Sequence, residues 1–172
     1  MDFRVLKIEN VYIDENLNIS YINSKNIKKP LEISSPVLYL PFGIDKNNDK
    51  IELNLQLRKT KCIKHNEELK IFLSFLKSLE NMFIDKLTEK YNVTVKSIIR
   101  LNEKYDPIIN TKLLIYYKKI KTDVFKDNEN YNFYKIEKGD KLKVIMFIDK
   151  LWIYKGIIYY KFKLRKIFVQ SV

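Results

Sequence analysis

Residues 150–165 read KLWIYKGIIYYKFKLR, two aromatic-rich runs joined by the dipeptide Lys155-Gly156. A two-residue connection that ends in glycine favours a β-hairpin, because glycine accepts the positive φ angle that such tight turns require. With these two residues as the turn, the facing pairs are Tyr154 with Ile157, Trp152 with Tyr159, and Lys150 with Lys161. We therefore predict an antiparallel hairpin and derive the two faces of its strands from this register.

Side chains alternate between the two faces of a strand, so this register gives the hairpin a charged face and an apolar face. The charged face combines cations with aromatic rings: Lys150, Trp152, Tyr154, Tyr159, Lys161, Lys163 and Arg165. The apolar face is predicted to enter the core: Leu151, Ile153, Ile158, Tyr160, Phe162 and Leu164. Like charges that face each other across strands are destabilising, so an anionic partner is expected to neutralise the charged face.

Single-stranded nucleic acid supplies what this charged face lacks. Its phosphates neutralise the lysines, and its unpaired bases stack on Trp152 and the tyrosines at roughly 1–3 kcal/mol for each base. The strand predicted over residues 112–119 extends this track. Its candidates are Lys112, Tyr116 and Lys118 in one register, and Tyr117 and Lys119 in the other. The structural alternative is a solvated sheet face whose aromatic rings cover apolar edges.

Net charge is concentrated at the C-terminal end of the chain. The 172 residues carry 33 Lys and Arg against 21 Asp and Glu, a formal charge of +12. Residues 111–172 hold 15 basic and 6 acidic side chains, together with 13 of the 23 aromatic residues. An AT-rich genome enriches Lys, Asn, Ile and Tyr through its codons, which explains part of the excess but not its position. A basic patch with interleaved aromatic residues points to a polyanionic partner.

Hydrophobic periodicity predicts strands at both ends of the chain and a helix in the middle. An apolar stripe predicts a helix over about residues 66–91, with Asn66 as its N-cap: Leu69, Phe72, Leu76, Leu79, Phe83 and Leu87. Strands are predicted over residues 3–8, 17–22, 51–57, 112–119, 142–148, 151–154 and 157–169. Residues 35–43, bracketed by prolines, predict an edge strand or extended segment and not a central strand. Residues 45–50 predict a polar turn, and residues 93–101 fit a helix or a strand equally.

This pattern predicts a mainly β fold with one long inserted helix, either an antiparallel OB-like β-barrel or an α+β arrangement. We expect residues 1–172 to form a single domain, with residues 1–30 as an N-terminal hairpin extension. The helix stripe also fits a homo-oligomer seam, although one stripe of this width more often packs into the core.

Residue types suited to catalysis and metal binding are scarce. Cys62 and His65, the single cysteine and histidine, lie in a lysine-rich connection without a third residue to orient them. The three glycines are isolated, which excludes a P-loop and a dinucleotide fingerprint. We therefore expect a protein that is not an enzyme and uses neither a cofactor nor a metal. The N-terminus lacks signal-peptide character and no 18-residue apolar run is present, so we expect an intracellular protein that is not secreted and does not bind membranes.

Three segments together resemble a known protein family. Residues 35–44, SPVLYLPFGI, resemble an element that begins with Ser-Pro and ends with Pro-Phe-Gly-Ile around an aromatic residue. Residues 105–113, YDPIINTKL, resemble a Y-x-P-x-(I/L)-x-x-K-L element. The third segment is Gly139-Asp140 followed by an apolar strand, residues 151–153 and a closing strand. In this order they resemble the single-stranded DNA-binding proteins of giant, nucleocytoplasmic large DNA viruses, a family with a phage-type OB fold.

The resemblance implies an OB-type barrel, single-stranded DNA as the ligand, and a role in viral DNA replication, recombination or repair. It points to Lys112 and Trp152 as binding residues. It also implies viral replication proteins as partners and a viral replication site in the host cytoplasm or nucleus as the location.

Two hypotheses of different classes follow. The first is a non-catalytic, largely sequence-independent single-stranded DNA-binding protein. RNA is the nearest competing ligand, because no residue visibly tests for a 2′-hydroxyl. The second is a structural or virion-associated interaction protein whose basic face binds an acidic protein partner.

Overall fold

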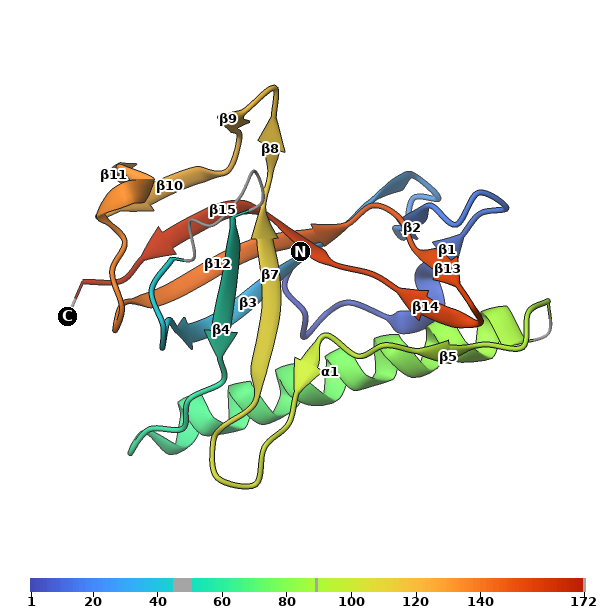
Figure 1. The fold of residues 1–172 in the computed structure, drawn as a ribbon, viewed down its shortest axis with the longest axis horizontal. Helices are drawn as coiled ribbons and strands as arrows, with labels where there is room; N and C mark the ends of the chain where they lie inside the picture. Colours follow the sequence, from blue (N-terminus) through green and yellow to red (C-terminus); the bar gives the residue numbers. More distant parts are fainter. Residues whose placement is uncertain (45–50, 89, 172) are drawn as a thin grey trace.

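The computed structural model describes residues 1–44, 51–88 and 90–171, and a five-stranded β-barrel lies at its centre (Figure 1). The barrel strands are β3 (Lys28–Tyr39), β4 (Glu52–Gln56), β7 (Ile108–Leu113), β12 (Lys141–Ile148) and β15 (Phe162–Val169). β3 pairs with β4, β4 with β7, β7 with β15, β15 with β12, and β12 with β3, which closes the ring. Within this ring β7 and β15 are parallel and the other pairs are antiparallel. A closed five-stranded barrel of this kind is an OB-like fold, so the predicted mainly β, largely antiparallel fold with one long helix is confirmed.

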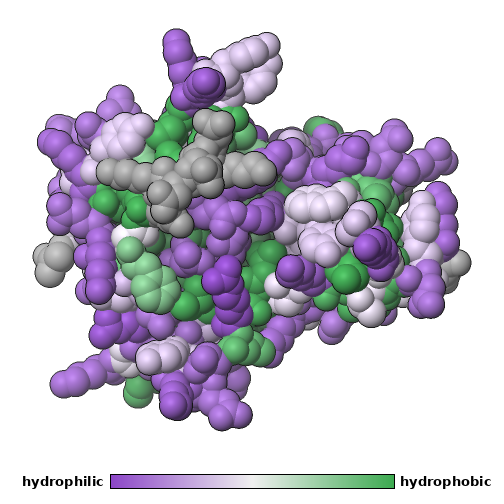
Figure 2. Space-filling view, in the orientation of Figure 1, coloured by the Kyte–Doolittle hydropathy of each residue, from purple (hydrophilic) through white to green (hydrophobic). Residues whose placement is uncertain are grey.

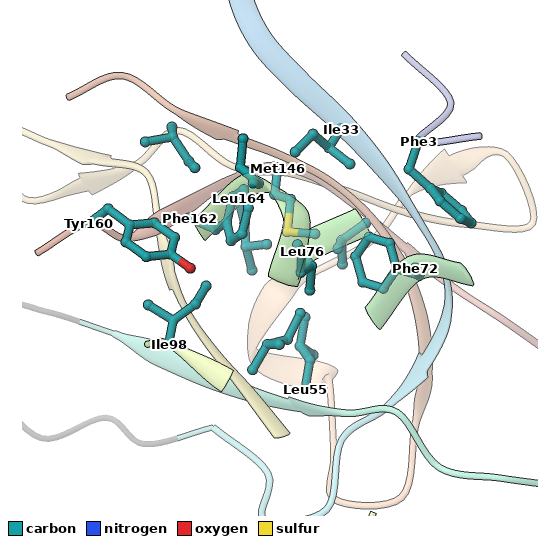
Figure 3. Close-up of a cluster of buried hydrophobic side chains, with 14 of the residues drawn as sticks. Phe3, Ile33, Leu55, Phe72, Leu76, Ile98, Met146, Tyr160, Phe162 and Leu164 are labelled. Carbon is teal, nitrogen blue, oxygen red and sulfur yellow. The ribbon is translucent and has the colours of Figure 1, made fainter. Parts of the chain in front are cut away.

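Period-two alternation along each barrel strand produces the core. Every barrel strand contributes alternate side chains that are fully buried: Leu31, Ile33, Leu53, Leu55, Ile109, Leu142, Val144, Met146, Phe162 and Leu164. Figure 3 shows several of them converging inside the barrel, with Leu55, Met146 and Leu164 around a common centre. The residues between them point outward, which places the charged side chains of β4, β7 and β15 on the outer surface, whereas the polar Thr111 of β7 is buried.

The helix α1 (Ile63–Thr88) runs along one end of the barrel and extends beyond it beneath the hairpins (Figure 1). All six residues of the predicted stripe are buried, so the predicted apolar face is confirmed. The helix begins three residues earlier than predicted, because Asn66 is not its N-cap. The Asn66 side chain instead accepts a hydrogen bond from the Thr60 N–H and donates one to the Thr60 carbonyl, each at 2.8 Å.

The strand β3 contradicts the prediction that residues 35–43 form no central strand. β3 pairs with β2 (Ile19–Ile22), β4 and β12, so it lies inside the sheet. The pairing register with β12 shifts by one residue at Ser35-Pro36. The Ser35 hydroxyl accepts a hydrogen bond from the Val144 N–H at 3.0 Å. This backbone N–H of β12 therefore has a hydrogen-bond partner in β3 although Pro36 interrupts the regular pairing.

The N-terminal region differs in part from its prediction. Residues 3–8 form no strand, and a short 3₁₀ helix, η1 (Ile8–Asn10), precedes β1 (Val11–Ile13). β1 and β2 form the antiparallel hairpin, and β2 pairs in turn with β3. Phe3 packs edge-on against Phe72 of α1, with the ring centroids 5.0 Å apart.

The remaining elements are short. Residues 93–101, which the sequence left open, contain the strands β5 (Thr94–Val95) and β6 (Ile99–Arg100). The single strand predicted over residues 112–119 is wrong, because β7 ends at Leu113 and a separate hairpin follows, β8 (Ile115–Tyr116) and β9 (Lys119–Ile120). The others are β10 (Asp123–Lys126), β11 (Glu129–Asn130), η2 (Phe133–Lys135), β13 (Trp152–Tyr154) and β14 (Ile157–Tyr159). The turn predicted over residues 45–50 lies outside the described residues. No helix in the described part of the chain has the length and apolar character needed to cross a membrane.

Candidate nucleic-acid interface

The hairpin β13–β14 has the predicted register. Trp152 pairs with Tyr159 and Tyr154 pairs with Ile157. The φ angles of Lys155 and Gly156 are +49° and +73°, the two positive values of a two-residue hairpin turn. A Cβ atom on Gly156 would lie 3.1 Å from the Asn92 carbonyl oxygen, so the turn also packs closely against the chain before β5.

The apolar face of the hairpin enters the core, as predicted. Its residues are buried apart from Ile153, which is half-buried: Leu151, Ile158, Tyr160, Phe162 and Leu164. Tyr160 lies against α1, where its hydroxyl donates a hydrogen bond to the buried Glu80 carboxylate and its ring meets Phe83 edge-on at 5.3 Å. Burial and the neighbouring Glu80 charge raise the pKa of Tyr160 well above its ordinary value. These contacts fix the hairpin on the helix.

The other face of the hairpin presents a row of aromatic and cationic groups. The rings of Trp152 and Tyr159 are nearly parallel, with an angle of 10° between their planes and 6.0 Å between their centroids. β14 pairs in parallel with β5, and this pairing brings the Lys96 ammonium to 5.6 Å from the Tyr159 ring centroid. Trp152 remains 44% exposed, so part of its surface is open to a stacking partner.

This row borders a cleft of about 240 Å³ between the hairpin and the outer surface of β4, β6 and β7. We call it the aromatic cleft. Its lining comes from five short segments of the chain, two of which belong to the β13–β14 hairpin: Glu52, Lys96, Ser97, Ile98, Arg100, Asn110, Trp152, Tyr159, Tyr160 and Lys161. Three of the ten predicted site residues therefore meet in one place: Trp152, Tyr159 and Lys161.

Three cations of the predicted charged face form ion pairs with acidic side chains. Lys161 pairs with Glu52, Lys163 with Asp149, and Arg165 with Glu32. The predicted facing of Lys150 and Lys161 is wrong, because Lys150 forms a β-bridge with Asn18 and the hairpin pairing ends at Trp152 and Tyr159. These three cations are therefore neutralised by carboxylates of the same chain, and the predicted repulsion between Lys150 and Lys161 is absent.

Glu52 is the acidic residue of the aromatic cleft. Burial of its carboxyl opposes ionisation, but hydrogen bonds from Lys161 and Asn110 outweigh that effect and hold the pKa of Glu52 below its ordinary value. A phosphate that binds Lys161 must therefore compete with an ionised carboxylate already in place.

The other predicted site residues lie around the cleft or away from it. Lys112 is on the outward side of β7, where it pairs in register with Glu52 on one side and Lys163 on the other. Lys163 and Arg165 lie over the Phe147 ring on the outer surface of β15 and β12. Tyr154 and Lys150 are exposed near the two ends of β13. Tyr116 and Lys118 belong to the β8–β9 hairpin, residues 115–120, which projects from the barrel at the top of Figure 1 and Figure 2.

Five polar residues of the cleft were not predicted from the sequence: Glu52, Lys96, Ser97, Arg100 and Asn110. Lys96 and Arg100 lie in the segment whose structure the sequence left open. Glu52 and Asn110 occupy outward positions on strands β4 and β7, and their alternation was the available signal. Among the described residues no group of three His, Cys, Asp or Glu side chains is placed to hold a metal ion.

The aromatic cleft lies between two parts of the barrel. One is the face of the second and third strands, and the other is the connection before the last strand. OB folds hold oligonucleotides and oligosaccharides in this place. Known family models and curated protein sequences give no match. Among solved structures, a C-terminally truncated single-stranded DNA-binding protein from bacteriophage Enc34 has a TM-score of 0.54 at 10% identity, over 95% of each chain. A second structure of the Enc34 protein has a TM-score of 0.50 at 9% identity, over 96% of this chain and 87% of that one. The single-stranded DNA-binding protein gp2.5 of bacteriophage T7 has a TM-score of 0.49 at 11% identity, over 83% of this chain and 87% of that one. At these identities the likeness to the Enc34 structures shows the fold.

Proposed function

We propose that this protein binds single-stranded DNA without catalysis and largely without regard to sequence. The observation that carries the proposal is the aromatic cleft, where the exposed Trp152 ring lies stacked beside Tyr159 and is flanked by cations. Trp152 offers a π surface to a base, and Lys96 and Arg100 offer positive charge to the phosphates on either side.

The position of the cleft on the barrel supports this ligand. OB folds bind oligonucleotides on the face of their second and third strands and with the loops before the second and fifth strands. In this chain the corresponding strands are β4 and β7, and the hairpin β13–β14 lies in the connection between β12 and β15. The Enc34 protein, which has the same fold, is described as a single-stranded DNA-binding protein.

Unpaired bases distinguish the ligand from duplex DNA. A base can stack on Trp152 only when its face is free, and a duplex hides its base faces within the helical stack. The 2′-hydroxyl is what lets a protein distinguish RNA from DNA, and the preference for DNA proposed here rests on the sequence resemblance to viral single-stranded DNA-binding proteins. The same resemblance supports a role in viral DNA replication, recombination or repair inside the host cell, alongside viral replication proteins.

Fluorescence anisotropy with labelled oligonucleotides tests the proposal. The probe is an oligo-dT of about 30 nucleotides, longer than the ~4–16 nucleotides that one OB fold occludes, compared with an equally long duplex and with oligo-U. We expect tighter binding of the single strands, weakened strongly between about 50 and 200 mM salt because phosphate contacts release counterions. Equal affinity for the duplex contradicts the stacking mechanism, and no binding at the lower salt concentration overturns the proposal.

A further inference from the structure

A second cleft, of about 340 Å³, lies at the opposite end of β4 from the aromatic cleft. It forms where the end of β3, the segment after β4, the first turn of α1 and the start of β12 meet. We call it the basic cleft, and its lining residues are Val37, Leu38, Tyr39, Arg58, Lys59, Thr60, His65 and Lys141.

The charge of the basic cleft differs from that of the aromatic cleft. Arg58, Lys59 and Lys141 are exposed, and no acidic residue is among the described residues that line the cleft. Within the part of the chain that the structure describes, none of these three side chains forms an ion pair. Among the described residues, no carboxylate has to be displaced from these three side chains when an anion enters, whereas Glu52 already holds Lys161 in the aromatic cleft.

The basic cleft is also held in shape by its own backbone. Tyr39 pairs in register with Gln56 of β4 and with Lys141 of β12, so it joins both walls. The segment after β4 is fixed by the two hydrogen bonds between Thr60 and Asn66, each at 2.8 Å. A cleft that is formed before binding costs little ordering entropy when a ligand enters.

Arg58 is positioned for phosphate rather than for a base. Its guanidinium carbon lies 4.4 Å from the centroid of the Tyr39 ring. In this arrangement the cation covers one face of the ring that a base would otherwise use, while the planar N–H groups remain free to form a forked contact with an anion. The chemistry of the cleft therefore favours the sugar-phosphate backbone.

We propose that the basic cleft binds phosphates of the same single strand whose bases stack in the aromatic cleft. This inference rests on the proposed function and adds a second contact to it. Glu52 and Arg58 are six residues apart along an extended segment, which corresponds to about 20 Å. A strand of the ~4–16 nucleotides that OB folds occupy can reach from one cleft to the other.

Two oligonucleotide lengths separate the two contacts. Oligo-dT of about 3 nucleotides, shorter than the ~4–16 nucleotides that one OB fold occupies, reaches the aromatic cleft alone, whereas oligo-dT of about 20 nucleotides reaches both clefts. The test variant is Arg58→Ala with Lys141→Ala, and the matched control is Lys25→Ala with Lys77→Ala, which removes the same charge at exposed sites outside both clefts. All four side chains are exposed, so each variant is expected to keep the fold, which thermal unfolding checks.

We expect the test variant to lose roughly tenfold or more in affinity for the longer oligonucleotide at about 50 mM salt, and to lose little for the shorter one. Its plot of log affinity against log salt for the longer oligonucleotide should become shallower by about 1.4, since two phosphate contacts at ~0.7 each are lost. A loss of affinity no larger than that of the control variant, or an equal loss for both oligonucleotide lengths, overturns the proposal that the basic cleft binds phosphates. If the wild-type protein binds neither oligonucleotide, the proposed function itself fails; if it binds both and the test variant matches the control, the basic cleft alone fails.

Discussion

Two hairpins of this protein have nearly the same composition and differ in what lies beneath them. The hairpin β13–β14 carries Trp152 and Tyr159 on one face, and its other face is fixed to α1 through Tyr160. The hairpin β8–β9 carries Tyr116 and Tyr117 beside lysines, but it projects from the barrel with strands of two residues each (Figure 1). One hairpin borders a cleft and the other is exposed.

A basic, aromatic sequence is therefore not by itself a binding surface. A stacking platform needs rings held at a fixed spacing, and that spacing comes from the buried side of the strand. Tyr160, Phe83 and Glu80 provide it for β13–β14. In the β8–β9 hairpin Ile115 and Ile120 pack against the core, but the Tyr116 and Tyr117 rings are exposed and contact each other edge-on, so fewer contacts hold these rings in place.

Trp152→Ala is expected to have the largest effect on binding. Loss of one stacked base, at ~1–3 kcal/mol, corresponds to a decrease in affinity for oligo-dT of about 5- to 150-fold. Because Trp152 is 44% exposed, the melting temperature should change little. Anisotropy and thermal unfolding together test this, with Tyr134→Ala in η2 as an aromatic control distant from the hairpin. If the variant unfolds at a much lower temperature but its folded fraction binds oligo-dT with unchanged affinity, Trp152 is a structural residue and not a stacking residue.

Tyr160→Phe is expected to weaken the support of the platform. The substitution removes the hydroxyl that satisfies Glu80 and leaves a buried carboxylate without its donor, at a cost of about 1–3 kcal/mol in the free energy of unfolding. Urea unfolding measures this as a lower midpoint at an unchanged slope. The control is Tyr21→Phe, at another buried tyrosine, on β2.

The pair Tyr160 and Glu80 also makes the free energy of unfolding depend on pH in a direction that can be predicted. The pKa of Tyr160 is raised in the folded protein, while in the unfolded chain it stays near the ordinary tyrosine value of 10.0. The hydrogen bond therefore contributes its full stability below about pH 10, and that contribution falls above pH 10 as the unfolded chain ionises first. The stability advantage of the wild type over Tyr160→Phe should shrink above pH 10. An advantage that grows there contradicts the assignment.

Glu52→Gln is expected to strengthen binding. The substitution removes the carboxylate that competes with phosphate for Lys161 and keeps an amide oxygen for Asn110. Both partners of the pair are about one-third exposed, so the effect should be modest, an affinity for oligo-dT raised about fivefold or less. Glu32→Gln is the matched control, because Glu32 pairs with Arg165 outside the aromatic cleft. A weaker complex with Glu52→Gln would show that Lys161 does not bind phosphate.

The local part of this arrangement could be predicted from the sequence. Lys155-Gly156 defines a two-residue turn, and period-two alternation then fixes which hairpin residues are buried, as the structure confirms. The apolar stripe of α1 was predictable for the same reason, since periodicity is a local property of the chain.

The parts that failed depend on distant segments. Glu52 and Lys161 are 109 residues apart, and nothing near Lys161 in the sequence indicates that a carboxylate will neutralise it. Pro36 alone predicts an edge strand, but the bulge at Ser35, whose hydroxyl accepts the Val144 N–H, lets β3 lie inside the sheet. The aromatic cleft joins five segments, so only the three members on or near one hairpin were assembled in advance.

Tyr117→Asn is expected to have the smallest effect on binding and tests the exposed hairpin directly. Tyr117 is 82% exposed and has a φ angle of +48°, a conformation that asparagine adopts readily, so the variant removes the ring without straining the turn. If a platform needs a buried support, affinity for oligo-dT should fall less than about threefold, below the ~1 kcal/mol lower limit for one stacked base. Anisotropy beside Trp152→Ala gives the comparison. A loss as large as that of Trp152→Ala would mean that the strand itself orders the β8–β9 hairpin on binding, and support from α1 would then not distinguish the two hairpins.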